Sequence, residues 1–335
     1  MNKRLVSFTA AVALACSAAL PVSAEVSDLL LNMNRAFAEQ DYDGVFTYIS
    51  GDEVSSIRVV HKVVGGEQRE RLVHMNGAPR EILRHGEEVV CIVMPGDDLA
   101  VLENSIPAGP FARAFVREFE RLGNSYTLSD MGEGRVAGRK ATRIAVLPRD
   151  GHRYGYRLWL DAENSLLLRS QLVDRNGRRL EEFLFSTILF GDDVKDSALE
   201  SEDMEGSMVS HLTLKNPDMA PAVTATKASD EKVNWQISWM PAGFKMASAD
   251  IRRKRASGGF VDSMIYSDGL ATFSIFVEPM PAKGAARMTA RNGATLAVSR
   301  GIRASDGGQR TFLATLVGEI PESTGTRIVE SIQAR

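Results

Sequence analysis

The chain has 335 residues, a formal net charge of −3 and 44% hydrophobic residues, an ordinary composition for a globular protein that builds its own core. After residue 20 no stretch approaches about 20 apolar residues, so the composition excludes a typical membrane-spanning helix there. Cys16 lies in the N-terminal apolar run. Cys91 lies in a strand-like run from Val89 to Val93, where a buried hydrophobe is favoured over an exposed thiol that pairs between chains.

Residues 1–24 have the organisation of a secretory signal peptide. Lys3 and Arg4 precede an apolar run that ends at residue 20, and small residues follow it. Cleavage is expected after Ala24, which leaves 311 residues with a net charge of −5 and no second cysteine for an intrachain disulfide. An exported chain is a poor candidate for nucleic-acid, nucleotide or cytosolic redox chemistry. Lipidation of Cys16 is the less favoured alternative, because the leucine of its motif lies one position too late.

Residues 25–195 are predicted to form one domain that is mainly β. It opens with a helix, because apolar residues recur at helical spacing at Val26, Leu29, Leu30, Met33 and Phe37. The pattern then changes to a period of two, which predicts short strands separated by tight turns. The strands predicted before the next helix are 45–50, 55–64, 70–75, 80–84, 89–94 and 99–102.

A second helix is predicted after Pro110, with Phe111, Phe115, Phe119 and Leu122 on one face. The strands predicted after it are 126–128, 139–148, 152–161, 166–174 and 180–190. A sheet of about ten antiparallel strands must curl or close to avoid long exposed edges. We therefore expect a half-open β-barrel with both helices against its concave side and room for a ligand inside.

The distribution of charge indicates a boundary between two domains. The net charge is −5 over residues 25–195, −4 over 196–228 and +4 over 229–335. This predicts an acidic linker over 196–228 and a smaller α+β domain over 229–335. Its predicted strands are 233–240, 250–254, 259–266, 271–277, 293–300 and 311–318, and a final helix from about residue 321 turns Ile328, Val329 and Ile332 inward.

The sequence contains no recognisable catalytic signature. It has no nucleophile elbow, no Walker phosphate loop and no helical pair of histidines with an adjacent glutamate. Five scattered histidines favour surface positions over metal ligation. Gly132-Glu133-Gly134 imitates part of a dinucleotide fingerprint, but a β-patterned run follows it instead of a helix. We therefore expect no metal, no cofactor and no enzyme, and a hydrolase is the least favoured class.

Two groups of side chains are candidates for binding. Arg252-Arg253-Lys254-Arg255 is either a solvated face or a site for an acidic protein segment or lipid phosphates. The aromatic group fits either ordinary core packing or a cavity for acyl chains, in which each buried methylene contributes about 0.8 kcal/mol. Its members are Phe46, Tyr48, Phe111, Phe115, Phe119, Tyr154 and Tyr156.

Several segments carry a resemblance to a known family. Those of the first domain are Phe46–Tyr48, Ile57–His61, Glu70–Leu72, Asn76–Glu81, Val90–Cys91, Tyr156–Asp161 and Leu172–Gly177. Those of the second are Trp239–Phe244 and the long run Tyr266–Glu278. In this order and spacing they resemble the RseB/MucB family, the periplasmic regulators of the sigma-E (AlgU-type) envelope stress response.

The resemblance implies a first domain similar to the lipoprotein carriers LolA and LolB. It also implies that the chain binds the periplasmic part of a membrane anti-sigma factor (RseA/MucA), shields it from site-1 proteolysis by DegS-type proteases, and is released by lipid or lipopolysaccharide fragments. We expect Arg252 to Arg255, Tyr266, Phe273 and Phe276 to contact the partner, and the aromatic group to contact lipid. A lipid or lipoprotein carrier is the alternative, although the extra domain argues against it. A homo-oligomer is compatible with the sequence.

Overall fold

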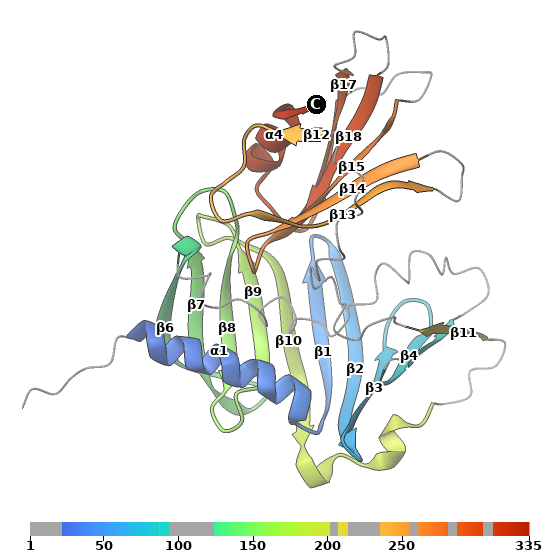
Figure 1. Ribbon diagram of the computed structural model, residues 1–335. Helices are drawn as coiled ribbons and strands as arrows, with labels where there is room; N and C mark the ends of the chain where they lie inside the picture. Colours follow the sequence, from blue (N-terminus) through green and yellow to red (C-terminus); the bar gives the residue numbers. More distant parts are fainter. Residues whose placement is uncertain are drawn as a thin grey trace, which may run out of the picture.

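The computed structural model describes residues 22–86, 88–93, 124–201, 207–213, 235–254, 260–280, 287–303 and 311–334. The chain forms two modules, each built on its own antiparallel sheet (Figure 1). No helix in these ranges is both long and apolar enough to cross a membrane. The described residues exclude most of the predicted leader, the predicted strand 99–102, the predicted helix that carries Phe111, Phe115 and Phe119, and Arg255.

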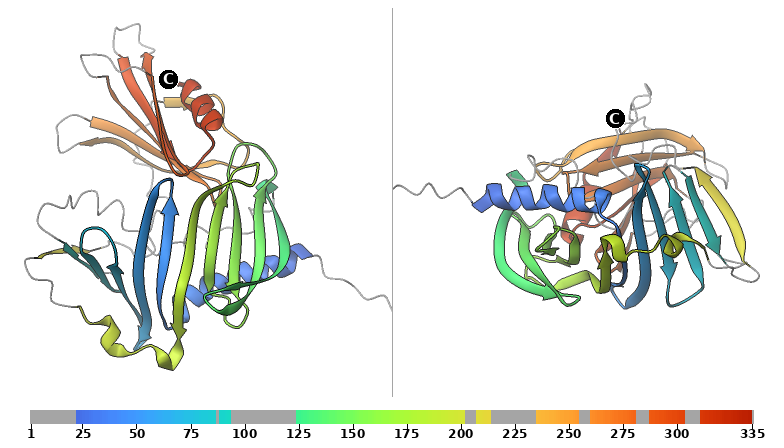
Figure 2. Two further views of the ribbon diagram at one scale, coloured as in Figure 1. Left: turned by 180° about the vertical axis from the view of Figure 1, so that it is seen from behind. Right: turned by 90° about the horizontal axis from the view of Figure 1, so that it is seen from below.

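The first module contains α1 (Val22–Glu39) and an 11-stranded sheet. The strands are β1 (Tyr42–Ser50), β2 (Glu53–Val64), β3 (Glu67–His74), β4 (Arg80–His85), β5 (Glu88–Val93), β6 (Tyr126–Val136), β7 (Arg139–Pro148), β8 (Gly155–Asp161), β9 (Leu167–Val173), β10 (Arg179–Phe190) and β11 (Met208–Thr213). Their order is β11-β5-β4-β3-β2-β1-β10-β9-β8-β7-β6. The pairing of β1 with β10 joins two meanders, and the edge strands β6 and β11 do not pair with each other. The sheet is therefore curled but open, which confirms the expected half-open barrel (Figure 2).

The predicted first helix is confirmed as α1, which crosses strands β6–β10 (Figure 1). Val26, Leu30 and Met33 form its buried stripe at i, i+4 and i+7 and belong to the core cluster of the sheet. The same cluster contains Phe183 and Phe185 of β10. Burial of this stripe fixes the helix on the sheet, because an isolated helix of this length is only marginally stable in water.

The segment predicted as a linker carries more structure than its acidic composition suggested. Asp196–Leu199 is a 3₁₀ helix, and the Asp196 carboxylate lies 2.7 Å from the Lys62 ammonium group of β2. Met208–Thr213 forms β11, in which Val209 lies opposite Ile92 of β5. A strand this short is stabilised by pairing with a strand that is distant in the sequence, so its own six residues do little to predict it.

The second module is an α+β unit, as predicted. Its six-stranded sheet has the order β13 (Lys245–Lys254), β14 (Phe260–Ser267), β15 (Thr272–Pro279), β18 (Thr311–Gly318), β17 (Thr295–Arg303) and β16 (Met288–Asn292). One face carries α4 (Glu322–Glu330) and the small pair β12 (Trp235–Ile237) and β19 (Ile332–Ala334) (Figure 1). Ile328 and Val329 of α4 pack in one core cluster with Leu296 and Leu316.

Several boundaries differ from the sequence-based expectations. β6 extends to Val136 beyond the predicted 126–128, and β13 begins at Lys245 rather than at residue 250. Ile332, predicted on the last helix, lies in β19, because α4 ends at Glu330 and the chain turns back to pair with β12. The edge strand β16 was not predicted, because all five of its residues are exposed and it lacks the apolar alternation that marks a half-buried strand.

Candidate functional site

The four described members of the aromatic group do not form one free apolar surface. Phe46 is 3% exposed, and its ring centroid lies 4.8 Å from that of Phe183 within the core. The Tyr48 hydroxyl donates a hydrogen bond to Glu181 Oε2 at 2.7 Å. The Tyr154 hydroxyl accepts one at 2.7 Å from the Arg291 guanidinium of the second module. The hydroxyls of both tyrosines thus point to the place where the two modules meet.

Tyr156 lies in the same region. Burial raises the pKa of its hydroxyl well above the ordinary value, and the carboxylate of Glu319 in the second module raises it further. Phe111, Phe115 and Phe119 are outside the described residues.

The residues predicted to bind a partner fall into three environments. Arg252, Arg253 and Lys254 lie near the end of β13, which is an edge strand of the second sheet. Phe273 is fully buried in the core and stacks on Tyr266 with ring centroids 5.4 Å apart, so it is a support for that ring rather than a contact surface. Phe276 is partly buried and lies on the opposite face of β15, because side chains alternate along a strand.

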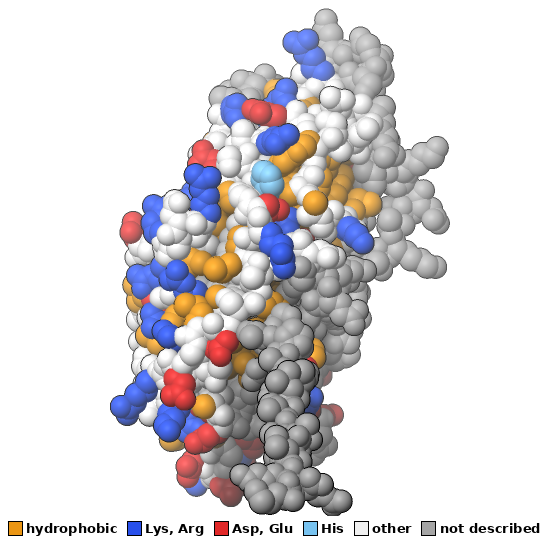
Figure 3. All heavy atoms as spheres, turned by 90° about the vertical axis from the view of Figure 1, so that its left-hand side faces the viewer, with side chains coloured by type: hydrophobic (Ala, Val, Ile, Leu, Met, Phe, Trp, Pro, Cys, Tyr) orange, Lys and Arg blue, Asp and Glu red, His pale blue; other side chains and the backbone are white. Residues whose placement is uncertain are grey.

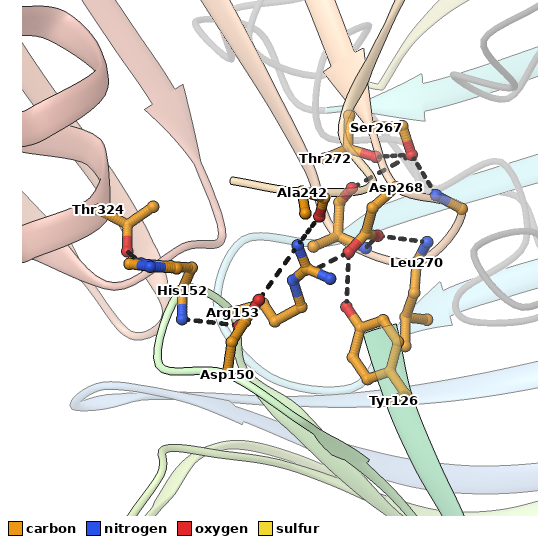
Figure 4. A network of polar contacts seen from close by, with 12 residues as sticks. Tyr126, Asp150, His152, Arg153, Ala242, Ser267, Asp268, Leu270, Thr272 and Thr324 are labelled. Atoms are coloured by element: carbon orange, nitrogen blue, oxygen red, sulfur yellow. Dashed lines mark hydrogen bonds and ion pairs between the residues drawn. The ribbon is translucent and has the colours of Figure 1, made fainter. Parts of the chain in front are cut away.

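The junction between the modules contains a buried ion pair between Arg153, which precedes β8, and Asp268, in the turn between β14 and β15 (Figure 4). Arg153 Nε lies 3.2 Å from Asp268 Oδ2, and both side chains are 0% exposed. The Arg153 guanidinium also donates to the carbonyl oxygen of Ala242 at 2.6 Å. It lies over the rings of Tyr126 and Phe244, 5.6 and 5.0 Å from their centroids. Asp150 Oδ2 of the first module lies 3.6 Å from the same guanidinium, so this cation is enclosed by groups of both modules.

Asp268 is held as an acceptor by further groups. Its Oδ1 accepts the backbone N–H groups of Leu270 at 2.9 Å and Ala271 at 2.8 Å, and its Oδ2 accepts the Tyr126 hydroxyl at 3.1 Å. Burial raises the pKa of Tyr126, and the Asp268 carboxylate adds to the increase. The turn positions the carboxylate, because aspartate side chains bind backbone N–H groups two or three residues ahead. Breaking such a pair from one side leaves an uncompensated buried charge.

A second polar cluster, the Glu181 cluster, lies where the β1–β2 hairpin meets the β16–β17 turn. Glu181 Oε1 accepts the Ser50 hydroxyl at 3.1 Å and the Ala294 amide of the second module at 2.9 Å. Gly293 has a φ of +57°, and a Cβ atom on it would lie 2.7 Å from Glu181 Oε1. The close approach of the two hairpins therefore requires glycine at this position.

Glu319 joins this cluster from the second module, between β18 and α4. Burial raises the pKa of the Glu319 carboxyl to about 7, and the nearby Glu181 carboxylate contributes to the increase.

A third contact connects α4 with the loop after β7. His152 Nδ1 lies 3.1 Å from Thr324 Oγ1, and its ring meets that of Trp239 edge-on with centroids 5.2 Å apart. The Arg327 guanidinium lies 3.9 Å from the Trp239 ring centroid.

On the left-hand side of the molecule as drawn in Figure 1, Lys and Arg side chains are spread over the surface with hydrophobic side chains between them (Figure 3).

The Arg153–Asp268 ion pair, the Glu181 cluster and the contact of His152 with α4 all connect the first module to the second. Among the residues that the structure describes, no three His, Cys, Asp or Glu side chains gather as a metal site. The sequence did not identify Arg153, Asp268, Glu181 or Glu319 as important. A signal was present, because the segments Trp239–Phe244 and Tyr266–Glu278, which carry the family resemblance, supply Ala242, Phe244 and Asp268 to the junction.

Comparison with known proteins assigns both modules. Residues 25–203 match the model of the MucB/RseB N-terminal domain, and residues 229–333 match that of the MucB/RseB C-terminal domain. The sigma factor AlgU regulatory protein MucB of Pseudomonas aeruginosa is 34% identical over 315 residues, which cover 93% of this chain and 92% of that protein. The sigma-E factor regulatory protein RseB of Escherichia coli K12 is 29% identical over 306 residues, covering 91% and 89% respectively.

Solved structures agree with this assignment. The complex of Pseudomonas aeruginosa MucA and MucB aligns with a TM-score of 0.72 at 29% identity, covering 93% of this chain and 99% of that chain. A structure described as MucB aligns with a TM-score of 0.59 at 28% identity, covering 93% and 98%. The two family models together span nearly the whole chain after residue 24, and the chain therefore belongs to the MucB/RseB family.

Proposed function

We propose that this protein is a periplasmic regulator of sigma-E-type signalling that is exported by cleavage near Ala24. It binds the periplasmic part of a membrane anti-sigma factor of the RseA/MucA kind and shields it from site-1 proteolysis. It acts by covering its partner and performs no catalysis. The observation that supports this most strongly is the similarity of the whole two-module chain to MucB in its complex with MucA.

The charge of the second module supports a role in holding the partner. Residues 229–335 carry a net charge of +4, and Arg252, Arg253 and Lys254 occupy an edge strand. A cationic edge attracts an acidic protein segment and steers its approach. Tyr266 and the partly buried Phe276 supply aromatic surface on neighbouring strands β14 and β15.

The junction supports release by lipid. Tyr48 and Tyr154 have apolar rings, but their hydroxyls bind Glu181 and Arg291 at the junction. An acyl chain that displaced these rings would break contacts between the modules, so it would favour a different arrangement of the two. Similarity to MucB solved with MucA exceeds similarity to the other MucB structure, which is compatible with more than one arrangement in the family.

Titration calorimetry tests the proposal with purified protein and the periplasmic segment of an anti-sigma factor of the RseA/MucA kind from the same organism. We expect binding that weakens when lipopolysaccharide or a single-chain amphiphile is added. An affinity that is unchanged at saturating amphiphile would refute release by lipid, while binding of the anti-sigma factor would still be supported. Absence of binding, together with extraction of lipoproteins from membrane vesicles, would indicate a carrier instead.

A further inference from the structure

The outer face of the first sheet is covered over only one of its halves. α1 packs on the inner, concave face, and no described helix or strand lies over the outer face of β7–β10 (Figure 2). Over β2 and β3 the acidic segment that follows β10 covers this face. The Lys62 ammonium group donates to the carbonyl oxygen of Val194 at 2.8 Å and lies 2.7 Å from the Asp196 carboxylate. The Arg71 guanidinium donates to the carbonyl oxygen of Ala198 at 3.2 Å. The chain itself thus pairs the cations of β2 and β3.

A row of guanidinium and indole groups crosses the other half. Trp159 of β8 lies directly opposite Arg143 of β7 on one side and Arg169 of β9 on the other, and side chains in such pairs point to the same face. The Arg169 guanidinium lies 4.5 Å from the centroid of the Trp159 ring. The ring reaches across to β6, where a Cβ atom on Gly134 would lie 3.0 Å from Trp159 Cδ1. All three side chains of the row are partly exposed, so an indole between two cations meets the solvent.

The outer surface of β7–β10 and the adjoining β9–β10 turn form what we call the basic outer face. Its carboxylates are Asp161, Glu163, Asp174 and Glu182, and its more numerous arginines are Arg139, Arg143, Arg157, Arg169, Arg175, Arg178 and Arg179. The Asp161 and Glu182 side chains are only 1% and 4% exposed beneath their arginine partners. The Arg178 and Arg179 side chains are 72% and 49% exposed. The charged groups that meet the solvent are therefore mainly cationic.

The shape and chemistry of the basic outer face fit the surface of an anionic bilayer. Strands β7, β8, β9 and β10 are each paired on both sides, so the face offers no free backbone edge to an extended peptide. The outer surface of a curled sheet is convex and forms no groove for a helix. A bilayer presents a broad layer of phosphates, which guanidinium groups bind in bidentate geometry, and tryptophan rings are enriched at the level of the headgroups. A lipid surface therefore fits this face better than an acidic peptide does.

We propose that the basic outer face docks this protein onto an anionic phospholipid bilayer, with the Trp159 ring at the level of the headgroups. Phe46 and Tyr48 point to the opposite face of the sheet, so this site is separate from the aromatic group that is expected to contact a releasing lipid. Each Lys or Arg near an anionic membrane strengthens binding about fivefold, and salt screens the attraction. The docking depends only on residues of this chain and on the bilayer, so it does not require the anti-sigma factor.

Flotation with lipid vesicles tests the docking on the chain without its predicted leader, residues 25–335. Vesicles of phosphatidylcholine with phosphatidylglycerol should bind it at least about tenfold more tightly than phosphatidylcholine alone, and added salt should weaken the binding. The triple variant Arg143→Gln, Arg157→Gln and Arg175→Gln should bind the anionic vesicles at least about tenfold more weakly, because three cations are lost from the face. The ion pairs of Asp174 and Glu182 are made by other arginines and stay intact in this variant.

A matched control removes the same number of charges from the second module. Lys245→Gln, Arg300→Gln and Arg303→Gln replace three exposed cations there. This triple variant should bind the anionic vesicles like the unsubstituted protein, because its substitutions lie outside the basic outer face. An equal loss of binding in the two triple variants would mean that only the net charge of the chain matters, and it would overturn the proposal.

Quenching of tryptophan fluorescence by brominated phosphatidylglycerol locates the contact. Trp159 should be quenched in the vesicle-bound protein. Trp235 and Trp239 pack in the core cluster of the second module, so the Trp159→Phe variant should show no quenching while it still binds the vesicles. Equal binding to neutral and anionic vesicles, or quenching that persists in Trp159→Phe, would also overturn the proposal.

Discussion

Replacing Arg153 by methionine should destabilise the protein strongly, because the Asp268 carboxylate would then be buried without a cation. Both side chains are 0% exposed. Removing one partner of a buried ion pair costs about 3–5 kcal/mol. Asp268 would keep the hydroxyl of Tyr126 and the backbone N–H groups of Leu270 and Ala271 as donors, so we expect the lower end, about 3 kcal/mol.

Urea unfolding followed by fluorescence and calorimetry measures the loss. Arg178→Met is the matched control, because its ion pair with Asp174 leaves the arginine side chain 72% exposed, and its removal should cost about 0.5 kcal/mol or less. The double variant Arg153→Met with Asp268→Asn should recover part of the stability, since no buried charge is left unpaired. A loss in Arg153→Met below about 1 kcal/mol, or equal to that of the control, would refute the reasoning.

Three further predictions concern the close approach of the hairpins, the first core and the basic edge. Gly293→Ala should lower the free energy of unfolding by more than the roughly 1–2 kcal/mol expected for an alanine in the left-handed conformation, because its Cβ would meet Ser50 and Glu181. Gly138→Ala, with open space around the new Cβ, should lower it only by the contribution of the backbone conformation. Equal losses of stability in urea unfolding would contradict this. Phe183→Ala should lose about 3–5 kcal/mol in thermal unfolding, because the ring is 1% exposed against Phe46 and Phe185, and a loss near zero would mean that the core is not packed this way. Replacing Arg252, Arg253 and Lys254 by serine should weaken binding of the anti-sigma segment and flatten its salt dependence in calorimetry, and an unchanged affinity at low salt would make the run a solvated surface.

The architecture of each module could be predicted from local patterns. The helical spacing of Val26, Leu30 and Met33 predicts α1, and the alternation of the buried Leu158 and Leu160 with the partly buried Arg157 and Trp159 predicts β8. Apolar periodicity reports which face of an element is buried, so it succeeds where one face meets a core. It missed the exposed edge strand β16, because that strand buries neither face.

The junction could not be predicted in the same way. Asp268 was interpreted as part of a hairpin turn, and its role depends on Arg153, 115 positions earlier in the chain. Glu181 and Glu319 each look like ordinary surface carboxylates in sequence, and their interaction depends on how the two sheets meet. Family resemblance identified the segment around Asp268 as distinctive, but residue type alone does not reveal a contact between distant positions.

Tyr48 and Tyr154 were predicted to contact lipid, and in the structure their hydroxyls bind groups at the junction of the two modules. The alternating aromatic pattern indicated an inward surface, which fits Phe46. The hydroxyls of the two tyrosines have hydrogen-bond partners at the junction, as buried tyrosine hydroxyls usually require. The aromatic surface and the module junction therefore share residues, which is why lipid binding is expected to compete with the contacts of the junction and to favour a rearrangement of the modules.

Protection of the anti-sigma factor from its site-1 protease tests the proposed function most directly. The periplasmic segment of the partner is incubated with a DegS-type protease, and its cleavage is followed with and without this protein. We predict that an equimolar amount of this protein slows cleavage strongly and that added lipid restores it. Cleavage at the same rate in the presence of a saturating amount of this protein would contradict a shielding role.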